Sequence, residues 1–214
     1  MSTSAIHGAW WVWLVAAGLY ILFRLWYDNW RGPLSKDEVE HFMRLAQSSP
    51  GRDHTDTAVM RAFLEKDDGK EFVMCNLIRL HPQPVIHPAT GDMITPLKLI
   101  KEYFRPFVVT LLLRGGHPML SSRKVGGYVD SWNTPPDPGW TAVGMMRYRS
   151  RRDAMCLTFD KRFQGGYPFK IAAIEQTFSF PTQVISEMVL RPRGIVALVL
   201  ALLAALVHLA SLLI

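Results

Sequence analysis

The stretch from Trp140 to Phe180 reads WTAVGMMRYRSRRDAMCLTFDKRFQGGYPFKIAAIEQTFSF, and its pattern of strand, helix and strand decides the fold. Residues 140–149 carry apolar side chains on both alternating faces, as in a strand that is covered on both sides. Ser150 is a suitable N-cap for the helix that follows, and Asp153 stands three residues later as in a capping box. Thr177–Phe180 predicts a short second strand, which the next residue, a proline, would stop.

The segments before this unit predict its other half. Glu71–Leu80, EFVMCNLIRL, is largely apolar on both faces and indicates a central strand. Thr95 and Pro96 suit the start of a helix, which Pro106 would kink or divide. The more polar stretch Leu120–Trp132 indicates a strand nearer an edge. The order of elements is therefore β-α-β-β-α-β, a ferredoxin-like α+β arrangement with an antiparallel sheet and helices on one face.

Two more helices are predicted between the first apolar segment and this domain. Ser35 and Glu38 form a capping box before the helix Lys36–Gln47, and a second helix begins at Thr55 and ends at Asp67. The first of them places four apolar side chains on one face, Val39, Phe42, Met43 and Ala46.

The apolar residues of the 214-residue chain are concentrated at its two ends. Ala9–Phe23 contains no charged residue and the apolar stretch continues past Arg24, while Gly194–Ile214 contains no Asp, Glu, Lys or Arg. Each segment can cross a hydrocarbon core of ~30 Å at ~1.5 Å per residue. We expect the first to be retained as an anchor, because the leading MSTSAIHG lacks the basic residues of a signal peptide.

The basic residues next to these spans predict the orientation. Arg24, Arg31 and Lys36 follow the first span, Arg191 and Arg193 precede the second, and the tails outside the spans have no Lys or Arg. We therefore predict a two-pass protein with a cytoplasmic central domain and both termini on the opposite side. The expected division is residues 1–34 as N-terminal anchor, 35–70 as helical linker, 71–186 as the α/β domain and 187–214 as C-terminal transmembrane helix.

Charge, cysteines and motifs exclude several classes of function. The net charge of +6 includes the arginines that flank the spans, so the bilayer accounts for it better than nucleic acid does. Cys75 and Cys156 are expected to be core residues of a reduced protein. His81 and His87 are not spaced as a metal site, and no phosphate loop, dinucleotide fingerprint or nucleophile elbow occurs. We expect no metal and no cofactor in the α/β domain.

Four quoted stretches together carry a family resemblance: EFVMCNLIRL, RGGHPML, RYRSRRD and FDKRFQGGYPFKIAAIEQTFSF. About half of the chain resembles the dimeric α/β-barrel superfamily, and within it a small bacterial family of unknown function related to EthD-like proteins and to cofactor-free antibiotic-biosynthesis monooxygenases. The resemblance covers neither span and implies the fold and a dimer in which two sheets face each other. It implies no catalytic set. For the two spans we expect a bacterial inner membrane.

The site residues are predicted individually. His117, Arg147 and Tyr148 are candidates for catalysis, and Asn76, Tyr128 and Tyr148 for ligand binding, because polar groups on neighbouring strands could meet at one end of a cavity. The alternative is structural: Asn76 bonds a loop backbone and Tyr148 packs with its hydroxyl at a rim. In this alternative Arg147 and Arg149 pair with Asp130 or Asp153.

The last span carries two further signals. Ala197, Ala201 and Ala205 recur on one helical stripe and predict close packing against another transmembrane helix, the chain's own first span or that of a partner. His208, with small Ala204 one turn before it, is a candidate ligand for a haem or chlorophyll-type ring, with an interfacial histidine as the alternative.

Two classes of function follow. In the first, the chain is an accessory or assembly subunit of a homodimer or larger membrane complex. In the second, it is a cofactor-free enzyme or binding protein, of monooxygenase or isomerase type, for a hydrophobic small molecule drawn from the bilayer. We favour the first, because a single anchor already suffices for an enzyme that acts on lipid-soluble substrates. Whether the chain is an enzyme stays open at this point.

Overall fold

The computed structural model describes residues 9–49, 51–186 and 190–212. The chain forms two compact units. One consists of Met1–Trp30 and Ile185–Ile214, and we call its two helices the helical hairpin; the other, Arg31–Val184, is the sheet domain.

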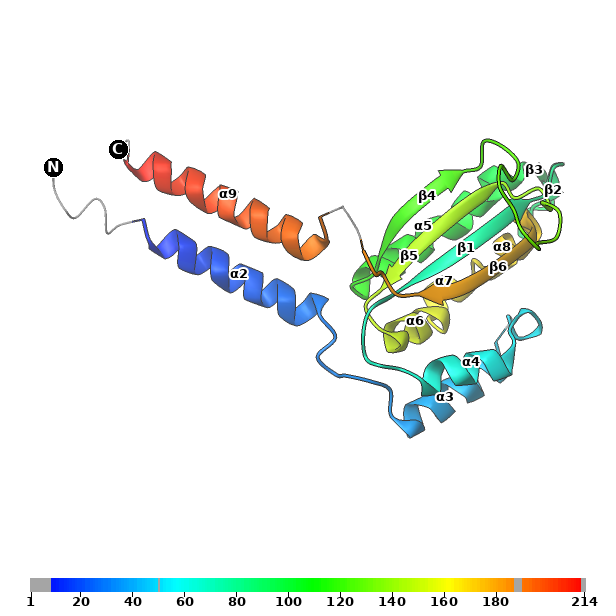
Figure 1. Cartoon of the computed structure of the whole chain (residues 1–214), viewed down its shortest axis with the longest axis horizontal. Helices are drawn as coiled ribbons and strands as arrows, with labels where there is room; N and C mark the ends of the chain where they lie inside the picture. The colour runs from blue at the N-terminus through cyan, green and yellow to red at the C-terminus, as the bar shows by residue number, and fades with distance from the viewer. Residues whose placement is uncertain (1–8, 50, 187–189, 213–214) are drawn as a thin grey trace. The chain divides into compact units, whose positions relative to one another are not determined.

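The helical hairpin consists of α2, Trp11–Tyr27, and α9, Pro192–Leu212 (Figure 1). The 21 residues of α9 are long and apolar enough to cross a membrane, whereas α2 is a shorter apolar helix of 17 residues. The helices run antiparallel, because contacts join their opposite ends. The Trp13 indole N–H donates to His208 Nδ1 at 3.3 Å, and Arg193 Nε donates to Asp28 at 2.7 Å.

The sheet domain is an α+β unit with a four-stranded antiparallel sheet, which confirms the predicted class and strand direction. The strand order is β4 (His117–Arg123), β5 (Ala142–Tyr148), β1 (Phe72–Leu80) and β6 (Ile174–Thr182). Strand β1 is central, and the register pairs its Phe72 with Tyr148 of β5 and its Val73 with Thr182 of β6.

The helices of this domain pack on one face of the sheet (Figure 1). They are α3 (Lys36–Gln47), α4 (Thr57–Glu65), α5 (Pro96–Leu113), α6 (Arg151–Thr158), α7 (Lys161–Gln164) and α8 (Tyr167–Ala173), with a 3-10 turn, η1, at Arg52–His54. One buried cluster joins sheet and helices, with Phe72, Met146 and Tyr148 from the strands and Phe107, Leu111 and Leu157 among the helical residues. The predicted stripe of α3 is buried as a whole.

Three boundaries differ from the sequence prediction. Strand β4 starts at His117 and ends at Arg123, because the chain then turns into a loop held by a Lys124–Asp137 ion pair. Strand β6 continues through Pro181, which an edge strand tolerates since its outer N–H groups need no partner. Helix α5 is not divided at Pro106; it runs on to Leu113 as one helix.

One pair of strands was missed. A short hairpin of β2, Val85–Ile86, and β3, Met93–Ile94, lies within the proline-rich stretch that the sequence predicts as a loop. Two-residue strands are too short to show an alternating pattern, so periodicity could not reveal them.

Candidate functional site

The side of the sheet that faces away from the helices is the first candidate surface. Phe72 and Met146 point into the helix-covered core, so the residues next to them in each strand point the other way. We call the apolar residues on this side the open sheet face: Cys75, Leu77, Leu120, Val143, Met145, Phe178 and Phe180.

The open sheet face is continuous across all four strands. By register, Cys75 lies between Met145 and Phe180, and Leu77 lies between Val143 and Phe178. The Phe178 ring stacks on Phe180 at 6.0 Å and meets Trp140 edge-on at 5.1 Å. Phe178 is 47% exposed and Phe180 is 43% exposed. Contiguous exposed apolar surface occurs at sites that bind proteins, membranes or ligands.

Paired arginines close both ends of this face. At one end Arg79 donates to the Pro138 carbonyl at 2.6 Å and pairs with Glu175 at 2.9 Å. At the other end the buried Arg147 donates to Glu71 Oε2 at 2.5 Å and also to the Gly115 carbonyl. The middle of the face is therefore apolar, and the charges at its ends are compensated.

The predicted ligand and catalytic residues do not converge. Asn76 and Tyr148 lie on the helix-covered side, whereas Arg147 and His117 are register partners on the opposite side. Tyr128 lies in the loop after β4, where its hydroxyl accepts the Trp140 indole N–H at 3.0 Å. The sequence places these residues on neighbouring strands correctly, but the alternation of side chains separates them.

Each of these polar groups has a partner within the domain. The Asn76 amide donates to the Met74 and Gly144 carbonyls at 3.1 and 3.2 Å and accepts the Ser179 hydroxyl at 2.7 Å. Tyr148 stacks on Phe72 at 5.2 Å, and burial raises the pKa of its phenol. His117 Nδ1 is 3.1 Å from the carbonyl of its own neighbour, Pro118.

A lysine that sequence reasoning did not single out lies between two aromatic rings. The Lys170 amine of α8 is 5.8 Å from the ring centre of Tyr103 and 5.9 Å from that of Tyr167. Burial lowers the pKa of Lys170 and raises the pKa of Tyr103. The rings stabilise the cation by cation–π attraction, so the arrangement holds a charge within the helical layer.

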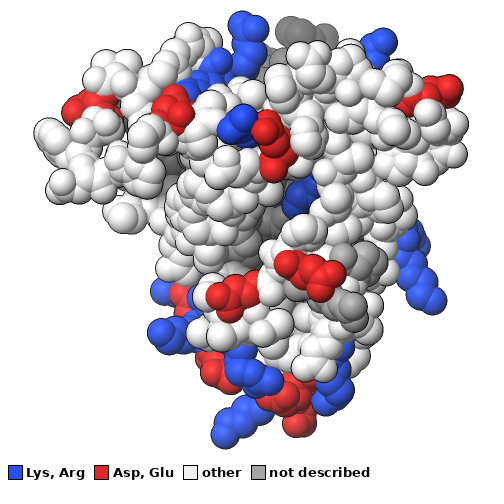
Figure 2. All heavy atoms as spheres, turned by 90° about the vertical axis from the view of Figure 1, so that its right-hand side faces the viewer, with Lys and Arg blue, Asp and Glu red and all other residues white. Residues whose placement is uncertain are grey.

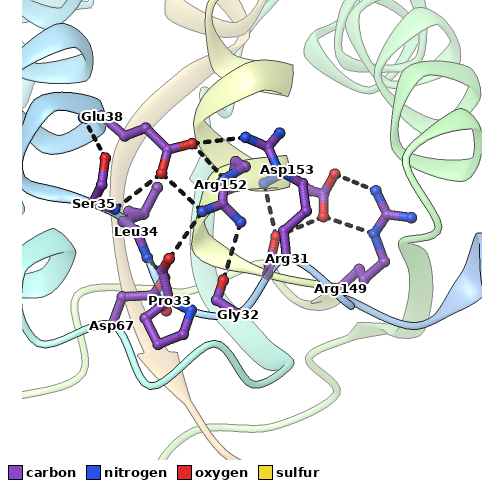
Figure 3. Close-up of polar contacts among 11 residues, drawn as sticks. Arg31, Gly32, Pro33, Leu34, Ser35, Glu38, Asp67, Arg149, Arg152 and Asp153 are labelled. Atoms are coloured by element: carbon purple, nitrogen blue, oxygen red, sulfur yellow. Dashed lines mark hydrogen bonds and ion pairs between the residues drawn. The ribbon is translucent and has the colours of Figure 1, made fainter.

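A second polar group connects the start of the domain to α6 (Figure 3). The nearly buried Arg152 donates to both carboxylate oxygens of Glu38, at 2.7 and 2.8 Å, and to the carbonyls of Gly32 and Pro33. The hydrogen bonds from Arg152 lower the pKa of Glu38 from 4.5 to about 2. This clamp fastens the chain that follows α2 to the sheet domain.

Of the two predicted capping boxes, the first forms completely and the second forms only in part. Ser35 and Glu38 form a complete capping box, as expected. Ser150 accepts the Asp153 N–H at 3.1 Å, but the Asp153 carboxylate accepts from the Ser150 hydroxyl and from Arg149 instead of from the Ser150 backbone. The hydrogen bond from Asp153 also raises the pKa of Arg149.

Charges of both signs are interspersed around α3 and α4 on the side shown in Figure 2. Arg61 of α4 is paired there with Glu40 of α3 and with Glu65, one turn on in its own helix. Such a mixture is typical of a solvated surface.

In α9 the buried small residue is Ala204, which is 2% exposed, whereas Ala201 of the predicted stripe is exposed and Ala197 and Ala205 are half-buried. The Trp10 ring meets His208 edge-on at 5.8 Å, and Trp13 occupies its Nδ1. Ala204 and His208 therefore pack within the helical hairpin, whereas Ala201 lies on an exposed side of α9.

Comparison with known proteins gives a fold and no function. No protein-family model and no curated protein matches the chain. The RPA0582 protein of unknown function from Rhodopseudomonas palustris is similar in structure, with a TM-score of 0.54 and 20% identity over 62% of this chain and 96% of that one. The methylated RPA0582 protein has a TM-score of 0.53 and 17% identity, over 63% of this chain and 96% of that one. At3g17210 from Arabidopsis thaliana has a TM-score of 0.37, which is too low to support an argument. Its identity is 9%, over 55% of this chain and 99% of that one. The chain thus shares an α+β fold with an antiparallel sheet with proteins of unknown function.

Proposed function

We propose that the chain is a membrane-anchored accessory or assembly subunit whose sheet domain docks through the open sheet face. The observation that carries the proposal is the continuous apolar surface around Leu77, Phe178 and Phe180, which lies on the side of the sheet opposite the described helices of the domain. Burial of apolar area at about 25 cal/mol per Å² is the main driving force for such docking.

We further infer that the sheet domain is a ferredoxin-like unit of the dimeric α/β-barrel type. The order β4-β5-β1-β6, with α5 before β4 and α6 to α8 before β6, supports this topology. A second copy of the chain is the simplest body to cover the open sheet face, because the two faces are identical and apolar.

The membrane part of the proposal has α2 and α9 both crossing the bilayer, with the sheet domain in the cytoplasm of a bacterial cell. The length and apolar character of α9 support one crossing. The antiparallel contacts of α2 with α9 favour a second, because they make the two helices one packed unit. The exposed Ala201 side of α9 then offers a surface for a partner's helix.

The enzyme alternative has less support. Its candidate residues lie on opposite sides of the sheet, and Asn76, Arg147 and Tyr148 are engaged in packing or hydrogen bonds. Arg147→Ala or Tyr148→Phe would change ligand affinity or turnover without disturbing assembly if this alternative held.

Gentle detergent extraction from native membranes, followed by native mass spectrometry, tests the docking proposal. We expect the parent chain as a homodimer or within a larger assembly, and Phe178→Asp as a dissociated chain, because a carboxylate on the open sheet face cannot be desolvated there. Val59→Asp on α4, at a position that is 65% exposed, is the matched control and should leave assembly unchanged. If Phe178→Asp assembles like the parent, the open sheet face is not the docking surface.

A further inference from the structure

A groove of about 300 Å³ runs along the outer side of α5, away from the sheet. It is lined by Arg105, Pro106, Val109, Thr110 and Leu113 of α5 and by Arg162 of α7. Val109 and Leu113 are 53% and 60% exposed, so the wall of the groove is apolar and open to solvent.

Two cations border this apolar groove. Neither the Arg105 nor the Arg162 guanidinium is hydrogen-bonded to a carboxylate within the parts of the chain that the structure describes. Glu102, three residues before Arg105, lies 3.0 Å from His87 Nε2. Asp160, two residues before Arg162, accepts from Arg114 at 3.0 Å and from the backbone N–H of Arg162. The backbone N–H and Arg114 lower the pKa of this carboxyl, so it stays ionised in that role. No acidic residue lines the groove itself, and its chemistry therefore complements an anion attached to a hydrocarbon chain.

The groove extends to Leu113, the last residue of α5, and so reaches the end of the sheet domain where this helix stops. Helix α5 ends against the last residues of β5, since a Cβ on Gly116 would lie 2.7 Å from the Arg147 carbonyl oxygen. Strand β6 ends at the same end, where Thr182 pairs with Val73 beside Arg147. The segment that follows α2 is also held there, through the bonds from Arg152 to Gly32 and Pro33. Both chain connections to the helical hairpin therefore start from the end of the domain where α5 stops.

We infer that this groove binds an anionic phospholipid of the bilayer in which the chain is anchored. The acyl chain lies along Val109 and Leu113, and the headgroup phosphate is bound by Arg105 and Arg162. Guanidinium groups suit this role because they offer paired donors to phosphate oxygens. The inference rests on the proposed membrane anchoring, which brings such lipids to the tethered end of the domain.

The test places the full chain in lipid nanodiscs, with Cys75 and Cys156 replaced and a fluorophore attached at Leu112→Cys, an exposed position of α5 beside the groove that does not line it. The nanodiscs contain phosphatidylcholine with a minor fraction of spin-labelled lipid, either phosphatidylglycerol or phosphatidylcholine. We expect the phosphatidylglycerol label to quench this fluorophore at least threefold more strongly than the phosphatidylcholine label does. A fluorophore at Val59→Cys on α4, 65% exposed, is the matched control and should show no such difference.

Arginine variants and competition with inorganic phosphate test what the groove binds. The double variant Arg105→Gln, Arg162→Gln should reduce quenching by the phosphatidylglycerol label to the level of the phosphatidylcholine label. The control variant Arg44→Gln on α3 should leave the quenching unchanged. Loss of the signal on addition of millimolar inorganic phosphate would overturn the lipid assignment in favour of a simple anion site. Equal quenching of the fluorophores at positions 112 and 59 in loaded nanodiscs would overturn the inference alone. A chain that fails to co-elute with nanodiscs would overturn both the inference and the membrane anchoring.

Discussion

At the scale of single residues, the most consequential contact is the one between Glu38 and Arg152. Glu38 caps α3 through the Ser35 backbone and at the same time accepts two hydrogen bonds from Arg152 of α6. One carboxylate thus connects a helix start, a second helix and the segment that follows α2. Removing either partner would leave a buried or half-buried charge uncompensated.

This contact predicts a specific pH dependence of stability. Because folding lowers the pKa of Glu38 from 4.5 to about 2, its stabilisation is complete above pH 4.5 and is lost as the pH falls toward 2. At pH 7 we expect Glu38→Gln to lower the free energy of unfolding by roughly 2–3 kcal/mol. Thermal unfolding of the detergent-solubilised chain, followed at several pH values, measures this difference.

The control for this prediction is Glu65→Gln, which removes an exposed carboxylate of α4 and should change stability little. The gap between the parent and Glu38→Gln should narrow steadily below pH 4.5. A gap of constant size from pH 7 to pH 3 would show that the charge of Glu38 contributes nothing.

The same residues show how far a sequence can be interpreted. The spacing of Ser35 and Glu38 is a local pattern, and the cap that it predicts is formed. Arg152 is 114 residues away, and no pattern in the sequence pairs it with Glu38, because that contact depends on how α6 packs against α3. Likewise Arg147 was expected to meet a carboxylate or a ligand, and the fold brings Glu71 to it.

At the scale of elements, the strands with strong apolar patterns were predicted well and those with weak patterns poorly. Strands β1 and β5 lie within two residues of their predicted bounds, because burial on both faces gives them a continuous apolar sequence. Strand β4 was predicted too far along the chain, since its polar, glycine-rich continuation resembles an edge strand but folds as a loop. In α5, Pro106 was expected to kink or divide the helix, but the helix is not divided there.

Packing of α9 predicts different outcomes at two alanines one turn apart. Ala204→Leu should separate α9 from α2, because the side chain at this position is 2% exposed and a leucine would overfill the contact. Ala201→Leu should leave the hairpin intact and release a partner helix from the solubilised complex.

Two measurements separate these outcomes. Cross-linking between cysteines placed in α2 and α9 reports the hairpin, and co-purification reports the partner. If Ala201→Leu retains every co-purifying protein, the exposed side of α9 does not bind a partner helix; if Ala204→Leu still cross-links like the parent, Ala204 is not a packing residue.

At the scale of the whole molecule, the α+β class and the antiparallel sheet were predictable, but the predicted site residues are divided between the two sides of the sheet, with His117 and Arg147 on one and Asn76 and Tyr148 on the other. Side chains at positions 147 and 148 lie on opposite sides of a strand by necessity, so they could not have shared one cavity on the same face. The strand patterns alone did not reveal the open sheet face, because each strand, taken by itself, looked buried on both sides; the contact between two sheets was expected only from the family resemblance.

The orientation in the membrane gives a direct prediction. In a chain without Cys75 and Cys156, a membrane-impermeant maleimide should label Ser4→Cys in unlysed spheroplasts and should label Val129→Cys only after the spheroplasts are lysed. The fully exposed side chain of Val129 in the sheet domain ensures that lack of reaction means lack of access. The reverse pattern would place the sheet domain outside the cytoplasm.

The ion pair between Asp28 and Arg193 also bears on the order in which the molecule is made. These partners are separated by 165 residues, and the whole sheet domain is synthesised between them. Until α9 emerges from the ribosome, Asp28 has Arg24, in the last turn of α2, as a partner. Contacts between such distant segments form late, because a long loop must close first. If α2 and α9 both cross the bilayer as proposed, α2 alone anchors the chain during synthesis, and the sheet domain has time to fold before α9 completes the pair.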